Sequence, residues 1–173
     1  MNEDIDRIAK CYEGYWRENT EMNQSKAGML QREECREISE DIGLVHAGQG
    51  GGRDVFIDGN TVIKFARHSL GAEDNGKEVE FYGNVPDIDK DRFASIEDSG
   101  VESYVYSKIW EEEKGGPLWV RMERADPIGS KRAASRLNNK LVKVECTDLV
   151  GGNVGKRGQK NVFIDYANCQ IDY

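Results

Sequence analysis

The sequence predicts an α+β fold in which helices accompany an antiparallel sheet. Residues 1–43 carry apolar side chains at spacings of three and four, as amphipathic helices do. From Leu44 onward, short β-rich runs joined by turns replace that pattern. Strands and helices do not alternate one by one, so a doubly wound parallel sheet is not expected. We expect residues 1–43 to form an N-terminal helical segment and residues 44–173 to form the main domain.

The N-terminal helical segment has an apolar stripe made of Ile5, Ile8, Tyr12, Tyr15 and Trp16. Such a stripe usually faces the core of its own domain, so we expect these helices to pack on the sheet. Two other uses stay open. The stripe could bind a partner protein, or it could be the seam of a homodimer.

The main domain begins with a strong hairpin signal. Val55–Ile57 and Thr61–Ala66 are β-rich runs, and the turn formers Asp58-Gly59-Asn60 join them. The other elements expected along the chain are a helix over 72–84, strands over Ser103–Trp110 and Leu118–Met122 linked by the turn EEEKGGP, a helix over Ser130–Val142, and a strand over Lys160–Asp165.

The composition restricts the classes of function. Acidic residues outnumber basic ones by 32 to 24, and the net charge of −8 argues against a general nucleic-acid binder. No apolar run approaches the ~20 residues that cross a bilayer, and the N-terminus has no signal-peptide pattern. We therefore expect no nucleic-acid partner, no membrane partner and a cytoplasmic location.

The four cysteines, Cys11, Cys35, Cys146 and Cys169, are scattered along the chain without a CxxC pair. With only two histidines available, a zinc site is not expected. The scattered spacing also argues against a disulfide framework, so we expect reduced thiols.

A glycine-rich segment, Ala47–Phe56, has four glycines in the five positions 48–52. Glycine has no Cβ, so the backbone N–H groups of Gly50, Gly51 and Gly52 can approach phosphate oxygens closely. On its own, such a segment is more often a flexible turn. It is not a Walker A loop, because no Gly-Lys-Ser/Thr follows it.

Lys64 lies in the middle of the apolar strand over Thr61–Ala66. Its ammonium group must either reach solvent at a sheet edge or meet an anion. A glutamate on the following helix is the natural partner. Helical spacing places Glu78 on the inward face with Phe81 and places Glu80 on the solvated face. Glu78 is therefore the better candidate.

Three oxygen-bearing side chains lie near the end of the sequence. Asp148 and Asn153 are five positions apart in a glycine-containing loop, and Asp165 ends the last predicted strand. Mg²⁺ prefers oxygen ligands, and phosphoryl transfer needs a carboxylate that positions the acceptor. Each residue alone is an ordinary turn former. The three in this register predict a site that handles phosphate and a metal ion.

Taken in order, these segments resemble a reduced protein-kinase-like domain, most like the small kinase-like proteins of phages and of archaeal viruses and plasmids. GQGGGRDVF resembles the Gly-rich loop, VIKFA the third strand with its lysine, and NGKEVEFY the helix whose glutamate pairs with that lysine. LWVRMERAD resembles the fifth strand and hinge, DLVGGN the catalytic loop, and IDYA the metal-binding Asp-Phe-Gly motif. The resemblance implies a kinase N-lobe with an antiparallel sheet, one regulatory-type helix and a much reduced C-lobe.

The resemblance also implies a role for each matching residue. Lys64 would contact the α- and β-phosphates of ATP and would be held by Glu78. Asp148 would be the catalytic base or would position the acceptor, and Asn153 and Asp165 would bind Mg²⁺. The remaining nucleotide contacts would come from the glycine-rich loop (Gly50, Gly51, Gly52 and Arg53) and from the hinge (Met122 as gatekeeper, with Glu123 and Ala125 holding the adenine).

The sequence departs from the kinase pattern at three places. Cys146 and Thr147 precede Asp148 in place of the usual histidine-containing pair, and Ala167 replaces the glycine of the metal-binding motif. Few residues follow Ala167, so no activation segment and no peptide-binding helices are expected. Nucleotide binding is therefore better supported than transfer to a protein.

The resemblance predicts an ATP- and Mg²⁺-dependent phosphotransferase that acts on itself or on a protein. Tyr166 and Tyr173, expected to be exposed, are candidates for self-phosphorylation. The main alternative is a pseudokinase-like module that binds nucleotide without turnover and engages a partner through its N-terminal helices. Phosphorylation of a small molecule and an unrelated α+β domain with accidental motifs also stay open.

Overall fold

The structure, a computed structural model, describes residues 2–18, 26–107 and 111–171. Its contacts divide the chain into two units. Unit 1 consists of Met1–Gly76 and Asp98–Arg121, and unit 2 of Lys77–Glu97 and Met122–Tyr173. In the described part of the chain, none of the helices combines the length and the apolarity needed to cross a membrane.

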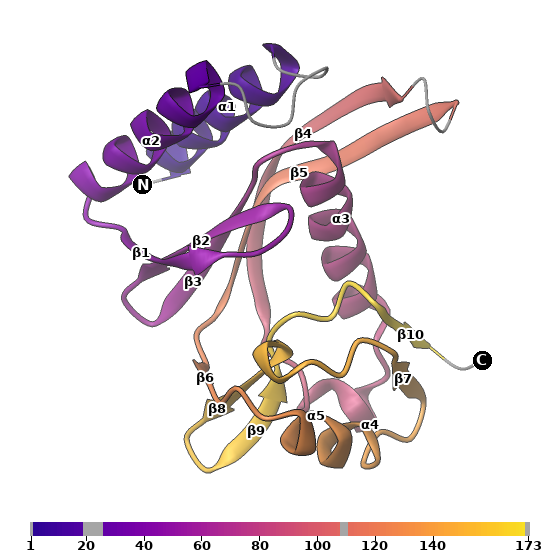
Figure 1. The fold of residues 1–173 in the computed structure, drawn as a ribbon. Helices are drawn as coiled ribbons and strands as arrows, with labels where there is room; N and C mark the ends of the chain where they lie inside the picture. The colour runs from indigo at the N-terminus through magenta and orange to yellow at the C-terminus, as the bar shows by residue number, and fades with distance from the viewer. Residues whose placement is uncertain (1, 19–25, 108–110, 172–173) are drawn as a thin grey trace. The chain divides into compact units, whose positions relative to one another are not determined.

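Unit 1 contains most of a five-stranded antiparallel sheet with strand order β1-β2-β3-β5-β4 (Figure 1). The predicted α+β fold with an antiparallel sheet is confirmed at this level. Between β3 and β4 the chain passes through helix α3 (Ser69–Asn84), and β5 then returns to lie beside β3. The strands are β1 (Val45–Gln49), β2 (Arg53–Asp58), β3 (Thr61–Ala66), β4 (Ile96–Ser107) and β5 (Glu112–Glu123).

The β2–β3 hairpin forms as the sequence predicts. Asp58 pairs with Thr61, so Gly59 and Asn60 make a two-residue turn. Gly59 has a φ of +58°, a left-handed conformation that glycine adopts without steric cost. The Thr61 hydroxyl donates to the Asp58 carbonyl oxygen at 3.0 Å. The turn fixes the register of both strands and thereby the face on which each of their side chains lies.

Two helices, α1 (Asn2–Glu18) and α2 (Lys26–Asp41), pack on one face of this sheet. The Tyr12 ring stacks on Phe65 of β3, with ring centroids 5.6 Å apart. The removal of these apolar side chains from water is the main force that holds the helices to the sheet. The buried core of unit 1 consists of Ile5, Ile8, Ala9, Tyr12, Cys35, Leu44, Phe56, Ile63, Phe65, Ala66, Ala72, Leu118 and Trp119.

The apolar stripe predicted on the first helix is therefore used inside the chain. Ile5 and Ile8 are each 1% exposed and Tyr12 is fully buried. The side chains of Tyr15 and Trp16 lie outside the described residues. The expectation that the helical segment packs on the sheet is confirmed for the described part of the stripe, Ile5, Ile8 and Tyr12, which belongs to the core of unit 1.

Two segments of unit 1 differ from the sequence-based prediction. Val45–Gln49 forms β1, although its polar and glycine-containing sequence gives no strand signal. The strand forms because pairing with β2 supplies its hydrogen bonds. The EEEKGGP segment (residues 111–117), predicted as a turn, belongs mostly to β5, which begins at Glu112. The first residues of β5 are exposed, so a strand tolerates their charged side chains there. The predicted end of β4 at Trp110 lies outside the described residues.

Unit 2 gathers short elements around a cluster of aromatic rings. Phe81 on α3, Phe93, Phe163 and Tyr166 form four ring pairs with centroids 5.0 to 5.5 Å apart. Two small sheets, β6-β8-β9 and β7-β10, belong to this unit. Its elements after α3 are α4 (Asp87–Lys90), β6 (Asp126–Pro127), α5 (Lys131–Asn138), β7 (Val144–Cys146), the 3-10 helix η1 (Gly151–Asn153), β8 (Val154–Arg157), β9 (Lys160–Phe163) and β10 (Cys169–Ile171).

A buried carboxylate explains why α5 is shorter than the helix predicted over Ser130–Val142. Asp89 is fully buried and accepts the backbone N–H groups of Val142 at 3.0 Å and Lys143 at 2.7 Å. These N–H groups cannot also bond to carbonyls one helical turn earlier. The helix therefore ends at Asn138, and the following segment is joined to α4 instead.

All four cysteines are paired, which contradicts the prediction of reduced thiols without a disulfide framework. Cys11 on α1 is bonded to Cys35 on α2, and Cys146 on β7 is bonded to Cys169 on β10. The prediction was wrong because it relied on spacing along the chain. The partners are 24 and 23 positions apart, and a helix pair and a strand pair bring them together.

Reduction of the disulfides should therefore destabilise the protein. Closing a loop of this length restricts the unfolded chain, and we expect the C146S/C169S double variant to lose about 3 kcal/mol of unfolding free energy. Urea unfolding of the oxidised protein and of the variant measures this difference. Mass spectrometry of unreduced tryptic peptides checks the pairing, and a Cys35-to-Cys146 linkage would contradict the structure.

Candidate functional site

Gly50, Gly51 and Gly52 join β1 to β2 in unit 1, and we call these three residues the glycine-rich turn. The Gly52 carbonyl oxygen accepts the backbone N–H of Arg67 at 2.9 Å. The turn also approaches the start of α3 so closely that a Cβ on Gly71 would lie 2.1 Å from that carbonyl oxygen, so only glycine fits there. At Gly50 and Gly51, by contrast, an added Cβ would meet nothing within 4 Å. The Cα positions of these two residues therefore border open space. The Gly50 N–H, however, donates to the Arg53 carbonyl oxygen at 2.9 Å, so the phosphate contact expected from this N–H is not available and the amides of Gly51 and Gly52 remain as candidates.

The side chains of Lys64 and Arg53 are buried on the face of the sheet opposite α1 and α2. Lys64 is 5% exposed and Arg53 is 7% exposed. Because β3 lies between β2 and β5, Lys64 is not an edge-strand lysine that faces solvent. The Nη1 atom of Arg53 lies 3.4 Å from Oδ1 of Asn75, so the Arg53 side chain reaches α3.

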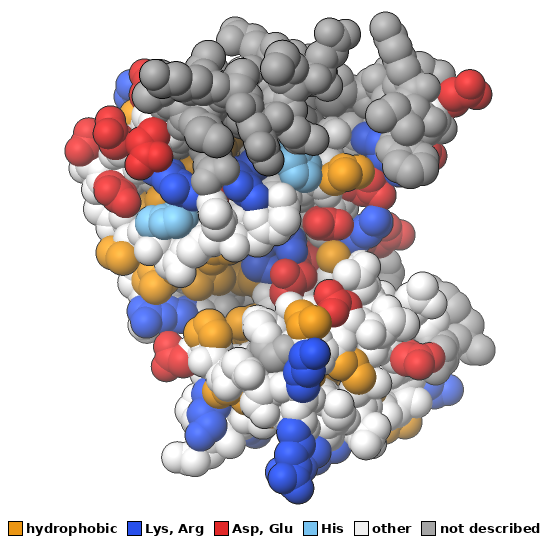
Figure 2. All heavy atoms as spheres, in the orientation of Figure 1, with side chains coloured by type: hydrophobic (Ala, Val, Ile, Leu, Met, Phe, Trp, Pro, Cys, Tyr) orange, Lys and Arg blue, Asp and Glu red, His pale blue; other side chains and the backbone are white. Residues whose placement is uncertain are grey.

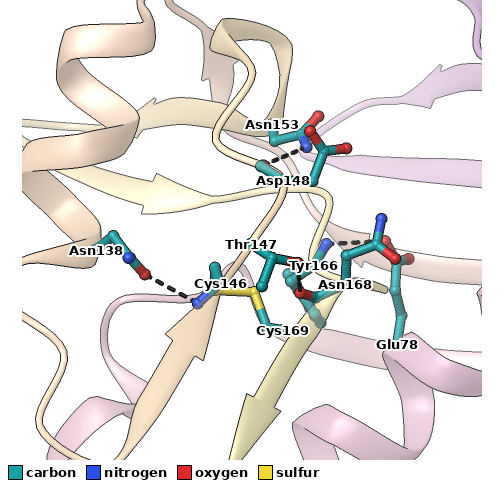
Figure 3. Close-up of a disulfide and its surroundings, with 9 residues drawn as sticks. All are labelled: Glu78, Asn138, Cys146, Thr147, Asp148, Asn153, Tyr166, Asn168 and Cys169. Atoms are coloured by element: carbon teal, nitrogen blue, oxygen red, sulfur yellow. Dashed lines mark hydrogen bonds between the residues drawn. A yellow bond between two sulfur atoms is a disulfide. The ribbon is translucent and has the colours of Figure 1, made fainter.

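The second half of α3, in unit 2, presents Glu78 inward. Glu78 is fully buried and Glu80 is exposed, as the helical spacing predicts. The Oε1 atom of Glu78 accepts the backbone N–H of Tyr166 at 3.2 Å (Figure 3). This bond ties the helix to the residue that directly follows Asp165. Lys64, its expected partner, belongs to unit 1.

The β8–β9 hairpin brings Asp148, Asn153 and Asp165 to its open end. The N–H of Ile164, directly after β9, donates at 2.9 Å to the carbonyl of Asn153, directly before β8. Asp165 is the next residue. The Nδ2 atom of Asn153 donates to the Asp148 carbonyl oxygen at 3.0 Å, and Figure 3 shows the two side chains next to each other. Asp148 is exposed, and the other two are half-buried.

The strand that leads into this loop is anchored on both sides (Figure 3). The Cys146–Cys169 disulfide joins it to β10, and the Thr147 hydroxyl donates to the Asn168 carbonyl oxygen at 3.1 Å. On its other side, the Cys146 N–H donates to Oδ1 of Asn138 at the end of α5, at 3.0 Å. Cys146 and Thr147, the two residues before the loop, thus link β7 to β10 and to α5.

The predicted hinge lies at the end of β5 and just beyond it. Met122 is fully buried, and Ala125 is 7% exposed. The Glu123 carboxylate accepts from Nη1 of Arg157 at 2.9 Å and from the Ser95 N–H at 3.3 Å. The Glu123 carboxylate, expected to contact a nucleotide, is therefore engaged by residues of unit 2.

The surface around α5 is basic, in contrast to the acidic chain as a whole. Residues 131–160 contain eight lysines and arginines and two acidic residues. Lys131, Arg132 and Arg136 on α5 are exposed, and Figure 2 shows lysine and arginine side chains gathered over this helix. Because α5 packs against η1, this positive charge lies near the Asp148 loop and favours an anionic ligand there.

The oxygen atoms present suit Mg²⁺ that arrives with a phosphate. Because Nδ2 of Asn153 donates to a carbonyl, Oδ1 of the same amide points the other way, and Asp165 adds a carboxylate. Among the residues that the structure describes, no three His, Cys, Asp or Glu side chains form a group able to hold a metal. Two protein ligands fit Mg²⁺, which usually keeps waters and binds substrate phosphates as well.

Tyr166 is not a candidate for self-phosphorylation, because it is 1% exposed. The expectation that it is exposed was wrong: its ring belongs to the aromatic cluster, and its hydroxyl donates to the Ala94 carbonyl oxygen at 2.8 Å. Burial, together with the nearby Glu78 carboxylate, raises the pKa of Tyr166 well above its ordinary value. Tyr173 lies outside the described residues.

A cluster around Asp54 in unit 1 was not predicted from the sequence. Asp54 is fully buried on β2 and accepts hydrogen bonds from Tyr12 and Arg36. A signal was present, because the alternation that singled out Lys64 also places Asp54 on the same face as the core residue Phe56.

Comparison with known proteins gives partial structural likeness only. No protein-family model matches the chain, and no curated protein matches it significantly. The solved structures that it resembles include WbdD, with TM-score 0.45 and 14% identity over 71% of this chain and 31% of WbdD. A co-crystal of WbdD with the kinase inhibitor LY294002 gives TM-score 0.44 and 14% identity over 72% of this chain and 32% of WbdD. The chain thus spans about a third of the length of these two WbdD chains.

The burial of Tyr166 should weaken the protein at alkaline pH. The folded state keeps a proton that the unfolded chain releases above the ordinary tyrosine pKa of 10.0. The stabilisation is therefore full below pH 10 and is lost as the pH rises above it. Y166F should cost about 1 kcal/mol at neutral pH through the lost hydrogen bond, but should flatten the fall in stability above pH 10. Urea unfolding between pH 7 and 11 tests this, and equal slopes would contradict it.

Proposed function

We propose that the protein binds ATP with Mg²⁺ and transfers the terminal phosphoryl group to a hydroxyl acceptor. The observation that carries the proposal is the meeting of Asp148, Asn153 and Asp165 at the open end of the β8–β9 hairpin. An exposed carboxylate lies there beside two side chains whose oxygen atoms are of the kind that hard cations prefer. Phosphoryl transfer depends on this combination, because it consists mainly of positioning and charge stabilisation.

Each residue has a distinct part in the proposed reaction. Asp148 orients the acceptor hydroxyl and accepts its proton. At the same time the acceptor oxygen forms a bond to the terminal phosphorus atom, and the bond from that phosphorus to the leaving ADP breaks. Asn153 and Asp165 hold Mg²⁺, which supplies positive charge to the phosphate oxygens. In unit 1, the ammonium of Lys64, buried and therefore weakly screened, binds phosphate oxygens, and so do backbone N–H groups of the glycine-rich turn.

The proposed fold is a protein-kinase-like N-lobe with a much reduced C-lobe. In this assignment Met122 is the gatekeeper, and the backbone of Glu123–Ala125 binds the adenine. The Glu123 carboxylate already bonds to Arg157, which supports a backbone contact in place of a side-chain contact.

One observation favours a second candidate, nucleotide binding without turnover. Cys146 and Thr147, which precede Asp148, are engaged with Cys169 and Asn168. They are therefore committed to holding β7 and β10 and do not support the Asp148 carboxylate. In this alternative, nucleotide stabilises the domain while another surface engages a partner.

Replacement of Lys64 by methionine should weaken nucleotide binding. Methionine has a similar length and keeps the buried site filled, so the loss reports the ammonium group. We expect the Kd for Mg-ATP to rise at least about tenfold, equivalent to about 1.4 kcal/mol. Calorimetric titration in magnesium and then in EDTA measures this change. E80Q, on the solvated face of α3, is the matched control and should bind as the wild type does.

Replacement of Asp148 by asparagine separates the two candidate functions. For a phosphotransferase, we expect Mg-ATP to bind with unchanged Kd while transfer of labelled phosphate falls by about 10²- to 10⁴-fold. Transfer to the protein itself and to water is followed with γ-labelled ATP. Turnover that is equal in both proteins would refute the role of Asp148. Tight binding with no turnover in the wild type would establish the second candidate.

A further inference from the structure

The glycine-rich turn is held by its carbonyl groups. An Nη2 atom of Arg67, the residue directly after β3, donates to the carbonyl oxygens of both Gly50 and Gly51, the latter at 2.9 Å. The Arg67 backbone N–H donates a hydrogen bond to the Gly52 carbonyl oxygen. Nε2 of His68 lies 3.3 Å from the Gly51 carbonyl oxygen. Three consecutive carbonyl groups of the turn are thus bound by the segment that joins β3 to α3.

This arrangement fixes the direction of the amides. In a trans peptide, the C=O and the N–H that follows it point in opposite directions, and the described chain has no cis peptide. With the carbonyls of Gly50 and Gly51 turned toward Arg67, the N–H groups of Gly51 and Gly52 point away from it. Gly50 and Gly51 border open space, since an added Cβ there would meet nothing within 4 Å. Successive N–H groups directed to one side form an anion-binding concavity.

Arg67 is in turn held by the buried carboxylate of Asp54. We call Tyr12, Arg36, Asp54 and Arg67 the Asp54 cluster. Nε of Arg67 lies 3.9 Å from Oδ1 of Asp54. The same carboxylate accepts the Tyr12 hydroxyl at 3.1 Å and Nη2 of Arg36 at 3.1 Å, and His46 Nε2 lies 3.9 Å from it.

The second arginine of the Asp54 cluster also reaches the edge of the turn. Nη2 of Arg36 donates to Oε1 of Gln49, the last residue of β1, at 2.7 Å. Burial by itself lowers the pKa of Arg36, but the hydrogen bond and charge of Asp54 outweigh burial, so the pKa is raised. A line of contacts therefore runs from α1 and α2 through one carboxylate to the residues on both sides of the glycines.

We propose that Arg67 is a positioning residue that orients the turn amides toward a triphosphate, and that the Asp54 cluster makes this orientation depend on α1 and α2. The inference rests on the proposed function, because it names what regulates the same nucleotide site. Arginine suits this task because its planar fork serves several acceptors at once, whereas lysine offers one compact ammonium. The N-terminal helices thereby set the affinity for nucleotide without touching it.

The test compares R67K with the wild type, using Mg-ATP and adenosine as calorimetric probes. Lysine keeps a positive charge near Asp54 but cannot serve the carboxylate and two carbonyls together. We expect the Kd for Mg-ATP to rise at least about tenfold, equivalent to about 1.4 kcal/mol, and the Kd for adenosine, which has no phosphate, to stay the same. R7K, an exposed substitution on α1 away from the Asp54 cluster, is the control and should change neither value.

Two further measurements keep the outcome decisive. In the ligand-free protein, the ¹⁵N–¹H resonances of Gly51 and Gly52 should move in R67K and stay in place in R7K. Y12F, which keeps the ring on Phe65 but removes one hydrogen bond to the Asp54 carboxylate, should weaken Mg-ATP binding by about threefold, because only part of the loss of one hydrogen bond to a charged group reaches the turn.

The results distinguish failure of this inference from failure of the proposed function. Equal Mg-ATP binding by R67K and the wild type overturns the role of Arg67 and leaves the function intact. No Mg-ATP binding by the wild type overturns the function. The glycine resonances, which need no ligand, then still decide the orientation of the turn: unmoved resonances in R67K overturn it, and shifted ones support it.

Discussion

A carboxylate without access to water, Asp54, is the constraint on which unit 1 depends. Burying an ionised carboxylate costs on the order of several kcal/mol unless other groups compensate it. Here the compensation comes from Tyr12 on α1, Arg36 on α2 and Arg67 after β3. Apolar contacts alone would allow the helices to shift on the sheet, but the carboxylate is satisfied only when all three elements are in place. The helix pair, the β2–β3 hairpin and the glycine-rich turn are therefore specified together.

Unit 2 positions the candidate site residues Asn153 and Asp165 differently. Hydrogen bonds and ring contacts of neighbouring residues fix the backbone that carries them. Asp165 follows β9, whose Phe163 stacks on Phe93, and precedes Tyr166, whose N–H is bound by Glu78. Asn153 is joined to the same hairpin by its own carbonyl. Short strands carry few hydrogen bonds, so the aromatic cluster supplies the rigidity that they lack. This leaves the oxygen atoms at the end of the hairpin in a defined place while the loop that carries them stays at the surface.

The sequence predicted what local patterns determine. The Gly59 turn set one hairpin, and helical spacing separated buried Glu78 from exposed Glu80. The grouping of Asp148 with Asn153 followed from a short loop. Patterns that depend on distant pairing were missed: β1 forms only beside β2, and each disulfide needs a tertiary contact that spacing does not reveal. The Asp54 cluster was missed for the same reason, since its partners come from three separate segments.

The connectivity of the disulfides has a consequence for how the chain matures. Four cysteines allow three pairings, and the one observed joins the first to the second and the third to the fourth. During synthesis the first pair emerges together, long before Cys146, so the correct partner is also the first one available. Each covalent loop lies within one unit. Cysteines that are oxidised in the order of their synthesis would therefore reach the native pairing without exchange of a wrong bridge.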